Sequence, residues 1–450
     1  MSLAGPAPVP TNPLRLLAAD LRAEREATVP FPPGPTSFSL ARTRRFERDP
    51  LPLLLDLYQR HGPVFTMRIL HGNSVFALGP EANHHILVAN AGNYSWREGH
   101  MGDLMPLLGD GLLTIDGDFH RRSRRIMLPA FHRERIEAAR ATMEAETAAA
   151  LDAIRPSAAF DLYAWTRRLA LRIAMRALFG LDPHRAQAGG LDAARTFEAA
   201  LGFYSRDYLL QILRGPRTPW AKMHAARARL DALIFSEITR RRETGERGED
   251  LLSLLLDAED EDGGRLSDQH VRDEVMTLLF AGHDTTTSTV AFLFYELARH
   301  PGLADDPAFV LDHAVDETLR LYPAAWIGPR RSRAPSVIAG VPVPGGVPVN
   351  YSSWVSHRLP DVWEEPEAFR PERFAPGNRE RIPRGAYVPF GGGSRICLGM
   401  RFGQAEIGVI ASRMLERFRL SLVPGHVLDV RQMPTISPRG GLPVTPRRAA

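Results

Sequence analysis

The sequence FGGGSRICLG, which runs from Phe390 to Gly399, decides the fold expected for this chain. It contains Cys397, the only cysteine in 450 residues, with three consecutive glycines before it and a fourth two positions after it. Glycine has no Cβ atom, so a glycine-rich backbone can approach a large ligand closely. Arg395 places a cation two residues before the thiol, and an apolar, helix-like segment follows from Leu398 to about Phe418. The stretch is therefore suited to presenting one thiol to a bulky partner.

A single cysteine leaves three roles open: a small buried hydrophobic residue, a catalytic nucleophile or a metal ligand. No Cys–His signature surrounds Cys397, and a zinc site would need clustered ligands that the neighbouring sequence lacks. A thiolate is stabilised near the start of a helix, where backbone N–H groups and the helix dipole provide positive charge. The sequence thus suits a thiolate facing a planar macrocycle, with Arg395 available for an acidic substituent.

The composition is that of an ordinary globular protein, with 44% hydrophobic and 24% charged residues. A formal net charge of +4 does not indicate nucleic-acid binding. One cysteine excludes an intrachain disulfide, which fits a reducing compartment. The N-terminus has no apolar run of signal-peptide or membrane-span length, so we expect a soluble, cytoplasmic protein without a membrane anchor.

Hydrophobic periodicity predicts a mainly α chain with a minor β region. A proline-rich segment at 30–38 belongs to an N-terminal arm, residues 1–40, and the expected single catalytic domain spans 41–450. Helices are expected at 13–27, 50–61 and, by periodicity, through most of 81–300. Two strands at 64–70 and 74–78 are expected to form a hairpin, short strands and turns are expected at 337–349, and a hairpin-like turn is expected at 433–444.

One expected helix, at about 267–300, is apolar almost all round and should run through the interior. Its centre reads AGHDTT, from Ala281 to Thr286. Two interpretations remain open. Thr285 and Thr286 can bond back to carbonyls one turn earlier and bend the helix. Alternatively, the helix is locally opened at Gly282, with Asp284 and Thr285 directed at a proton-consuming reaction.

Glu317 and Arg320 lie three residues apart on one face of another expected helix. Such a pair is usually a surface ion pair that contributes little to stability. Here the sequence FRPERF follows at 369–374, and its Arg373 can complete a Glu–Arg–Arg cluster. If buried, the cluster would fix geometry more than add stability.

These motifs resemble the cytochrome P-450 superfamily of haem-thiolate monooxygenases, in its soluble bacterial type. The resemblance covers about residues 45–445, with the Glu–Arg pair, PERF and AGHDTT in the family's order and spacing. It implies the cytochrome P-450 fold, with haem buried between a long central helix and the cysteine-ligand loop. The fixed positions of the family's haem-ligand signature are matched by Phe390, Gly391, Gly393, Arg395, Cys397 and Gly399.

The resemblance also implies roles for individual residues. Cys397 would be the axial ligand of the iron of haem b, and Asp284 and Thr285 the catalytic pair that delivers protons. Ala281 and Gly282 would lie over the distal haem face, and Glu317, Arg320 and Arg373 would be structural. The haem propionates would be bound by Arg395, by His120 and Arg124 in the segment 116–125, and by Arg330 or Arg331, of which Arg330 is favoured.

The implied activity is insertion of one oxygen atom of O2 into a C–H or C=C bond of a lipophilic small molecule: a fatty acid, terpenoid, steroid or polyketide. Two electrons would come from NAD(P)H through an acidic ferredoxin or flavodoxin that docks near Arg121, Arg122 and Arg125. Two alternatives remain: a peroxide-driven peroxygenase or haem isomerase, and a non-catalytic haem carrier or sensor. The implied substrate pocket is apolar and aromatic, and its candidate residues are Trp96, Met101, Leu104, Phe203, Phe280, Trp326, Ile327 and Ile436.

Overall fold

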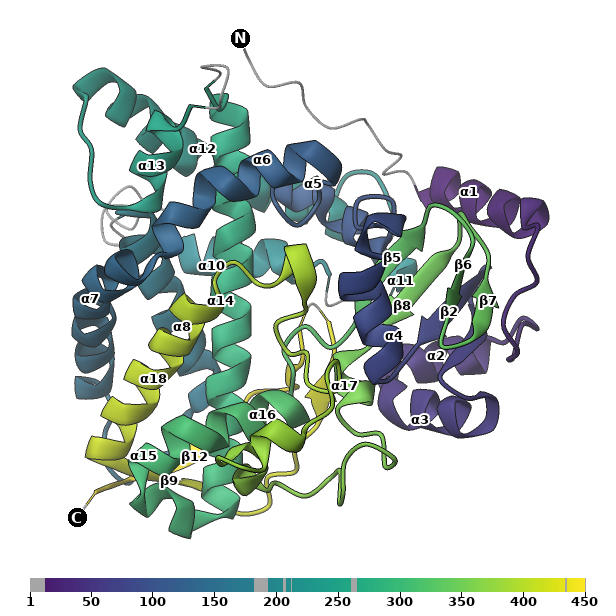
Figure 1. Cartoon of the computed structure of the whole chain (residues 1–450). Helices are drawn as coiled ribbons and strands as arrows, with labels where there is room; N and C mark the ends of the chain where they lie inside the picture. The colour runs from purple at the N-terminus through teal and green to yellow at the C-terminus, as the bar shows by residue number, and fades with distance from the viewer. Residues whose placement is uncertain are drawn as a thin grey trace. The chain divides into compact units, whose positions relative to one another are not determined.

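The computed structural model describes residues 13–181, 193–204, 208–211, 213–259, 265–433 and 435–449. These residues fall into two compact units, whose elements are labelled in Figure 1. The helical unit contains residues 105–311 and 398–449, and the mixed unit contains residues 13–104 and 312–397. No helix among the described residues has the length and apolar character needed to cross a membrane.

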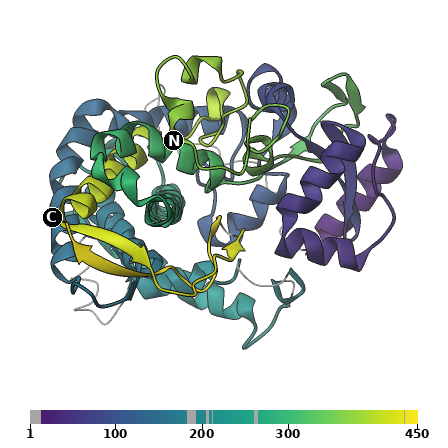
Figure 2. The ribbon, with the colours of Figure 1, turned by 90° about the horizontal axis from the view of Figure 1, so that it is seen from below.

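The helical unit is built around α14 (Asp268–Arg299), a helix of 32 residues that is seen end-on in Figure 2. Ser267 caps its N-terminus by accepting a hydrogen bond from the His270 N–H at 3.2 Å. Almost every residue of α14 from His270 to Leu297 is buried, and each fully buried Leu, Phe or Val contributes about 1.5–3 kcal/mol. The predicted interior helix is therefore confirmed, with bounds within one residue of those expected.

Several helices surround α14 and supply the rest of this core. α14 packs against α8 (Leu162–Ile173), α12 (Pro219–Thr244), α13 (Leu251–Asp257) and α18 (Met400–Arg417). Further described helices of this unit are α5 (Met105–Leu108), α6 (Gly117–Met127), α7 (Arg133–Asp152), α10 (Ala193–Leu201), α11 (Tyr208–Gln211) and α15 (Pro307–Phe309).

The expected opening of the long helix at Gly282 is wrong, because α14 continues without interruption through AGHDTT. The Thr285 hydroxyl donates to the Ala281 carbonyl at 2.7 Å, so the back-bonding interpretation holds for this residue. It fails for Thr286, whose hydroxyl donates to a Glu406 carboxyl oxygen at 3.0 Å. The two threonine hydroxyls thus find hydrogen-bond acceptors while the helical backbone stays closed.

The strands of the helical unit form two small sheets near the C-terminus. β12 (Pro443–Arg448) lies between β4 (Phe160–Asp161) and β9 (Phe418–Leu422), whereas β10 (Val430–Arg431) pairs with β11 (Ser437–Pro438). The single hairpin turn predicted at 433–444 is therefore wrong. Gly440 and Gly441 have φ of +81° and +92° and redirect the chain from β11 into the other sheet.

The mixed unit contains a five-stranded sheet in the order β1-β2-β8-β5-β3. β1 (Val64–Ile69) and β2 (Gly72–Ala77) form the predicted hairpin, with Val64 opposite Ala77. The other strands of this sheet are β3 (Tyr94–Ser95), β5 (Gly328–Ser332) and β8 (Pro348–Tyr351), and a separate hairpin joins β6 (Ser336–Ile338) to β7 (Val341–Val343). The helices described for this unit are α1 (Pro13–Glu26), α2 (Leu40–Arg48), α3 (Pro50–His61), α4 (Pro80–His84), α16 (Val315–Leu321) and α17 (Ser353–Ser356).

A buried ion pair ties α16 to the segment that follows α17. Arg320 donates to the two carboxylate oxygens of Glu317 at 2.7 and 2.8 Å, and neither side chain is exposed. The remaining bonds of the guanidinium go to the main-chain carbonyls of His357, Pro366 and Ala368. Arg373 also reaches Glu317, at 3.3 Å. The structure thus brings the three predicted residues together, in the kind of buried cluster that fixes geometry more than it adds stability.

Candidate functional site

The cysteine loop of the mixed unit is shaped by glycine. Gly391 and Gly393 have φ of +71° and +62°, in the left-handed region that residues with a Cβ rarely adopt. A Cβ on Gly393 would also clash with the carbonyl oxygen of Leu87. After a short helical turn at Gly393–Arg395, the Cys397 N–H donates to the Phe390 carbonyl at 3.0 Å. The loop holds Cys397 at an exposed position.

Two arginines of the mixed unit converge on one aromatic ring. The guanidinium carbon of Arg330, on β5, lies 3.5 Å from the centre of the Trp96 ring. That of Arg395, two residues before Cys397, lies 4.9 Å from the same ring. Arg330 is 2% exposed and also faces Tyr351. The arrangement places two guanidinium groups beside the cysteine loop.

Arg331, the neighbour of Arg330 on β5, has a different set of partners. It donates to the Asp20 carboxylate on α1 and to the main-chain carbonyls of Glu98 and Gly346. Burial opposes ionisation of Asp20, yet its hydrogen bonds to His71 and Arg331 leave the pKa below its ordinary value. Arg331 therefore holds α1 against the sheet, and the binding of a ligand carboxylate by Arg330 remains a prediction.

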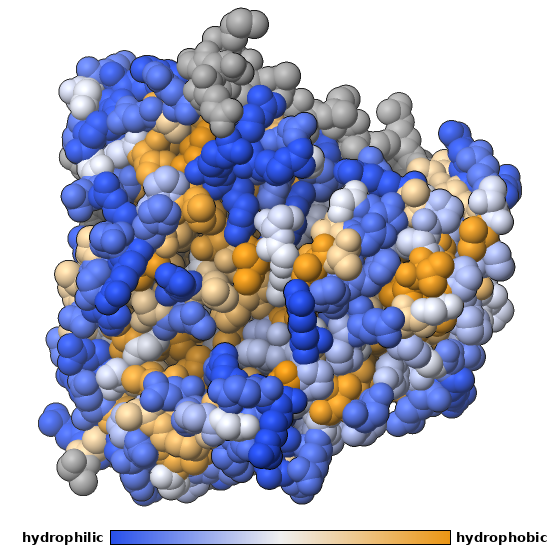
Figure 3. Space-filling view, in the orientation of Figure 1, coloured by the Kyte–Doolittle hydropathy of each residue, from blue (hydrophilic) through white to orange (hydrophobic). Residues whose placement is uncertain are grey.

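The predicted pair on α6 lies in the helical unit. His120 is buried and Arg124 is partly buried, and their spacing of four residues puts them on one face of the helix. Arg121 and Arg125 are exposed, and Arg121 forms an ion pair with Asp118. Hydrophilic side chains cover this part of the molecule in Figure 3.

The acid of AGHDTT is buried and has partners on two neighbouring elements. Asp284 is 1% exposed, and its Oδ2 accepts a hydrogen bond from the Thr435 hydroxyl at 2.7 Å. An Arg167 nitrogen, from α8, lies 3.5 Å from Oδ1. The adjacent His283 is fully buried, and burial lowers the pKa of its imidazole to about 4. At neutral pH the imidazole ring of His283 is therefore uncharged.

A second buried carboxyl contacts the same helix and was missed from the sequence. Glu406 of α18 is 1% exposed, and Thr286 donates to its Oε2 at 3.0 Å. Burial raises the pKa of Glu406 to about 8, so this carboxyl is largely protonated at neutral pH. The available signal was an acidic residue on the otherwise apolar face of the helix that follows the cysteine.

Most of the sequence matches a known family. Residues 29–306 and 309–444 match the model of the family described as cytochrome P450. The chain belongs to the cytochrome P450 family. It is therefore a haem-thiolate enzyme of the monooxygenase class, as the three motifs predicted.

Several relatives resemble this cytochrome P450 over most of its length. The cyclooctat-9-en-7-ol 5-monooxygenase of Streptomyces melanosporofaciens is 32% identical over 435 residues, which are 90% of this chain and 92% of that enzyme. Cyclooctatin synthase of the same organism is 32% identical over 425 residues, or 88% and 90% of the two chains. The structure of retinoic acid bound cyanobacterial CYP120A1 is 27% identical, with a TM-score of 0.84 over 94% of this chain and 100% of that one.

The residues of the mixed unit fit a haem. The glycine backbone around the thiol has no Cβ atoms at Gly391–Gly393 to keep a planar ring away. The guanidinium groups of Arg330 and Arg395 would match the charge of two propionate carboxylates. Trp96 was predicted as a substrate contact; the structure places it against these two arginines, and its contact with substrate remains a prediction.

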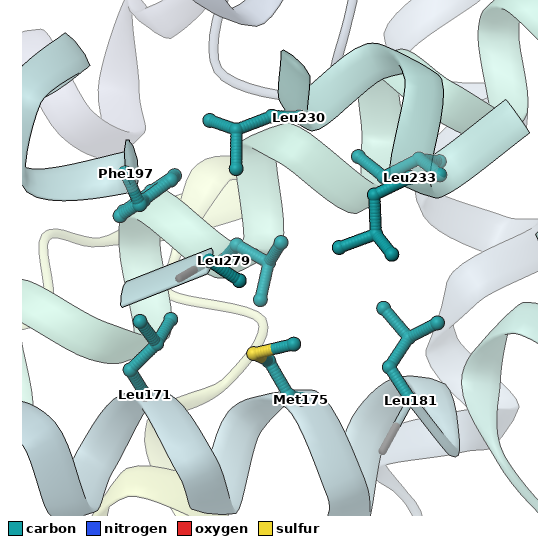
Figure 4. Close-up of a pocket in the computed structure, with 9 residues that line it drawn as sticks. Leu171, Met175, Leu181, Phe197, Leu230, Leu233 and Leu279 are labelled. Carbon is teal, nitrogen blue, oxygen red and sulfur yellow. The ribbon is translucent and has the colours of Figure 1, made fainter. Parts of the chain in front are cut away.

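Figure 4 shows a small apolar cavity. It lies in the helical unit between α8, α10, α12 and α14, and apolar side chains point into it. Its volume is about 10 Å³, which is at or below what one water molecule needs. Its lining residues are Leu171, Met175, Leu181, Ala193, Phe197, Leu230, Leu233, Ile234 and Leu279.

The predicted substrate-pocket residues are distributed over both units. Phe203, Phe280 and Ile436 belong to the helical unit, whereas Trp96, Met101, Leu104, Trp326 and Ile327 belong to the mixed unit. Phe203, Phe280, Leu104, Trp326 and Ile436 are buried. Their role as substrate contacts remains a prediction.

Replacing Glu406 by Gln should change how stability depends on pH. The pKa of Glu406 is raised from 4.5 to about 8 in the folded protein. Between these pH values the folded state keeps the carboxyl proton that the unfolded state has lost, so the wild type loses stability as the pH rises from 4.5 towards 8. The Glu406→Gln variant should therefore gain free energy of unfolding over the wild type by about 1.4 kcal/mol per pH unit in that window. Urea unfolding between pH 5 and 8 measures the difference.

Glu416→Gln is the matched control, because Glu416 lies on the same helix and pairs with Arg413 at a side-chain exposure of 50%. Its difference from the wild type should vary by less than about 0.5 kcal/mol over the same pH range. A Glu406→Gln difference that is equally flat would contradict the burial of an ionisable carboxyl.

The two neighbouring arginines of β5 should differ in their effect on haem retention. Arg330→Ala should lose haem to apomyoglobin about tenfold faster than the wild type, as expected for the loss of one charge-assisted hydrogen bond. Arg331→Ala should change this rate little and should instead expose α1 to limited proteolysis, because Asp20 loses its guanidinium partner. Faster haem loss from Arg331→Ala than from Arg330→Ala would reverse the assignment.

Proposed function

We propose that this cytochrome P450 inserts one oxygen atom of O2 into a C–H or C=C bond of a lipophilic terpenoid, using two electrons from an external redox partner. The observation that carries the proposal is the similarity to two Streptomyces enzymes, named as a cyclooctat-9-en-7-ol 5-monooxygenase and as cyclooctatin synthase. The predicted pocket residues are apolar or aromatic, which supports a substrate of this polarity. Fatty acids, steroids and polyketides are the competing classes.

Cys397 supplies the thiolate, because the chain contains no other cysteine. Haem b, when bound, supplies the activation of dioxygen and the transfer of an oxygen atom, which side chains alone do not perform. Arg330, Arg395, His120 and Arg124 would bind the propionate carboxylates through charge-assisted hydrogen bonds. Phe390, Gly391 and Gly399 shape the backbone around the thiolate, and Ala281 and Gly282 leave room beside the acid–alcohol pair.

Asp284 and Thr285 deliver protons to the reacting oxygen. The Thr285 hydroxyl proton is directed to the Ala281 carbonyl at 2.7 Å, so the hydroxyl oxygen keeps lone pairs that can accept a hydrogen bond from water. Neighbouring side chains on a helix diverge by about 100°. A proton that passes from Asp284 to Thr285 therefore travels through water.

The electron donor is an acidic protein that binds beside α6. Arg121 and Arg125 are exposed, and Arg122 is partly exposed, so this helix offers several guanidinium groups to an incoming partner. Exposed charges of this kind increase the association rate and are screened by salt. A ferredoxin or a flavodoxin, reduced by NAD(P)H through a reductase, has the required charge.

A panel of candidate substrates tests the proposal. The purified haem protein is titrated with sclareol as a terpenoid alcohol, lauric acid, progesterone and a macrolactone, and the Soret band is followed. Sclareol should shift the band with a dissociation constant at least about tenfold lower than those of the other three compounds. A tenfold difference corresponds to the binding free energy of about one favourable contact in the pocket. Tighter binding of another class would replace the terpenoid assignment.

Turnover assays distinguish a monooxygenase from a peroxygenase and from a haem carrier or sensor. A ferredoxin, its reductase and NADPH should yield a product that carries one oxygen atom from O2. Product formation with hydrogen peroxide alone, and none with the donor system, would establish the peroxygenase alternative. Spectral shifts without product under either condition would favour a haem carrier or sensor.

A further inference from the structure

The turn between β10 and β11 is bonded to α14 at two points. The Thr435 hydroxyl donates to Asp284 Oδ2 at 2.7 Å. One turn further along α14, the Ser288 hydroxyl donates to the Ile436 carbonyl. Asp284 and Ser288 are four residues apart and share one face of the helix. All of these residues are buried, so the turn is fixed against the centre of α14.

The hydrogen bond from Thr435 differs from every other interaction of Asp284. Arg167 approaches Oδ1 at 3.5 Å, which is an ion-pair distance, and Oδ1 has no hydrogen-bond partner among the described residues. Tyr163 of α8 faces the same carboxylate, and burial together with the charge of Asp284 raises its pKa. Thr435 is therefore the one described side chain that hydrogen-bonds the Asp284 carboxylate.

A hydroxyl is well suited to hold a carboxyl group that gains and loses a proton. It donates to the carboxylate and, after rotation about its C–O bond, accepts from the protonated acid. A guanidinium such as that of Arg167 can only donate, so it holds the charged form alone. A contact through Thr435 keeps the carboxyl group in place in both protonation states and leaves Oδ1 for proton exchange.

We propose that Thr435 is the positioning residue for Asp284: it anchors Oδ2 throughout the proton-transfer cycle, so that Oδ1 stays directed toward the proton path. The proposal rests on the proton-delivery role proposed for Asp284. Loss of the anchor lets the carboxyl group rotate, which slows proton delivery and allows reduced oxygen to escape as hydrogen peroxide.

A double-mutant cycle tests the hydrogen bond without relying on activity. Thr435→Val, Asp284→Asn and the double variant are unfolded in urea in the haem-bound form. If the bond forms, the midpoint shifts of the single variants should exceed, when summed, the shift of the double variant. Additive shifts for Thr435→Val and Asp284→Asn would overturn the proposal.

Coupling of electrons to product tests the positioning role. With sclareol, or with whichever panel compound gives the largest Soret shift, product per NADPH should fall about fivefold in Thr435→Val, the factor expected for losing one hydrogen bond. Thr435→Ser should restore it, and Thr435→Val should cause no further loss in the Asp284→Asn background. Unchanged coupling in Thr435→Val would leave Thr435 a purely structural residue.

The two proposals fail in different ways. If Asp284→Asn leaves product per NADPH unchanged, the proton-delivery role of Asp284 is wrong. If Asp284→Asn lowers that ratio and Thr435→Val does not, the role of Asp284 stands and the positioning role of Thr435 is wrong. If both lower it additively, Thr435 acts on another group.

Discussion

Burial of the polar segment His283–Thr286 inside α14 is the constraint on which the helical unit depends. An unpaired polar group costs about 1–3 kcal/mol in a protein interior, so each of these side chains lowers stability unless it has a hydrogen-bond partner. Asp284 is bonded by Thr435, Thr285 by its own helix and Thr286 by Glu406. His283 is kept neutral by burial, and its ring nitrogens have no hydrogen-bond partner among the described residues. The C-terminal turn and α18 are held to α14 partly by these bonds, so the chemistry of the segment and the packing of the unit have the same origin.

The mixed unit also buries charged side chains, the arginines Arg320 and Arg330. Arg320 satisfies its guanidinium with Glu317 and three main-chain carbonyls. Arg330, only 2% exposed, lies against the rings of Trp96 and Tyr351. The first has a structural role, because its guanidinium ties α16 to the segment after α17. The second is grouped with Arg395 beside the cysteine loop, and its binding of a ligand carboxylate remains a prediction.

Local features of the fold could be predicted from the sequence, and long-range partners could not. The apolar run predicted α14 to within one residue, and the glycines predicted a backbone in the cysteine loop that only glycine readily adopts. Glu406 and Thr435 were not predicted as partners of α14, because they lie 120 and 151 residues from Thr286 and Asp284. The Asp20 partner of Arg331 likewise could not be predicted, because the two residues are 311 positions apart. The opening at Gly282, one of the two interpretations of AGHDTT, is absent, because α14 continues without interruption through this segment.

The central claim is that Cys397, as the only thiol of the chain, ligates the haem iron, and one spectrum tests it most directly. The reduced, carbon-monoxide-bound wild type should show the red-shifted Soret band of a thiolate-ligated haem. Cys397→Ser should retain its fold, judged by circular dichroism, and lose that band. Persistence of the thiolate band in a folded Cys397→Ser protein would contradict the assignment.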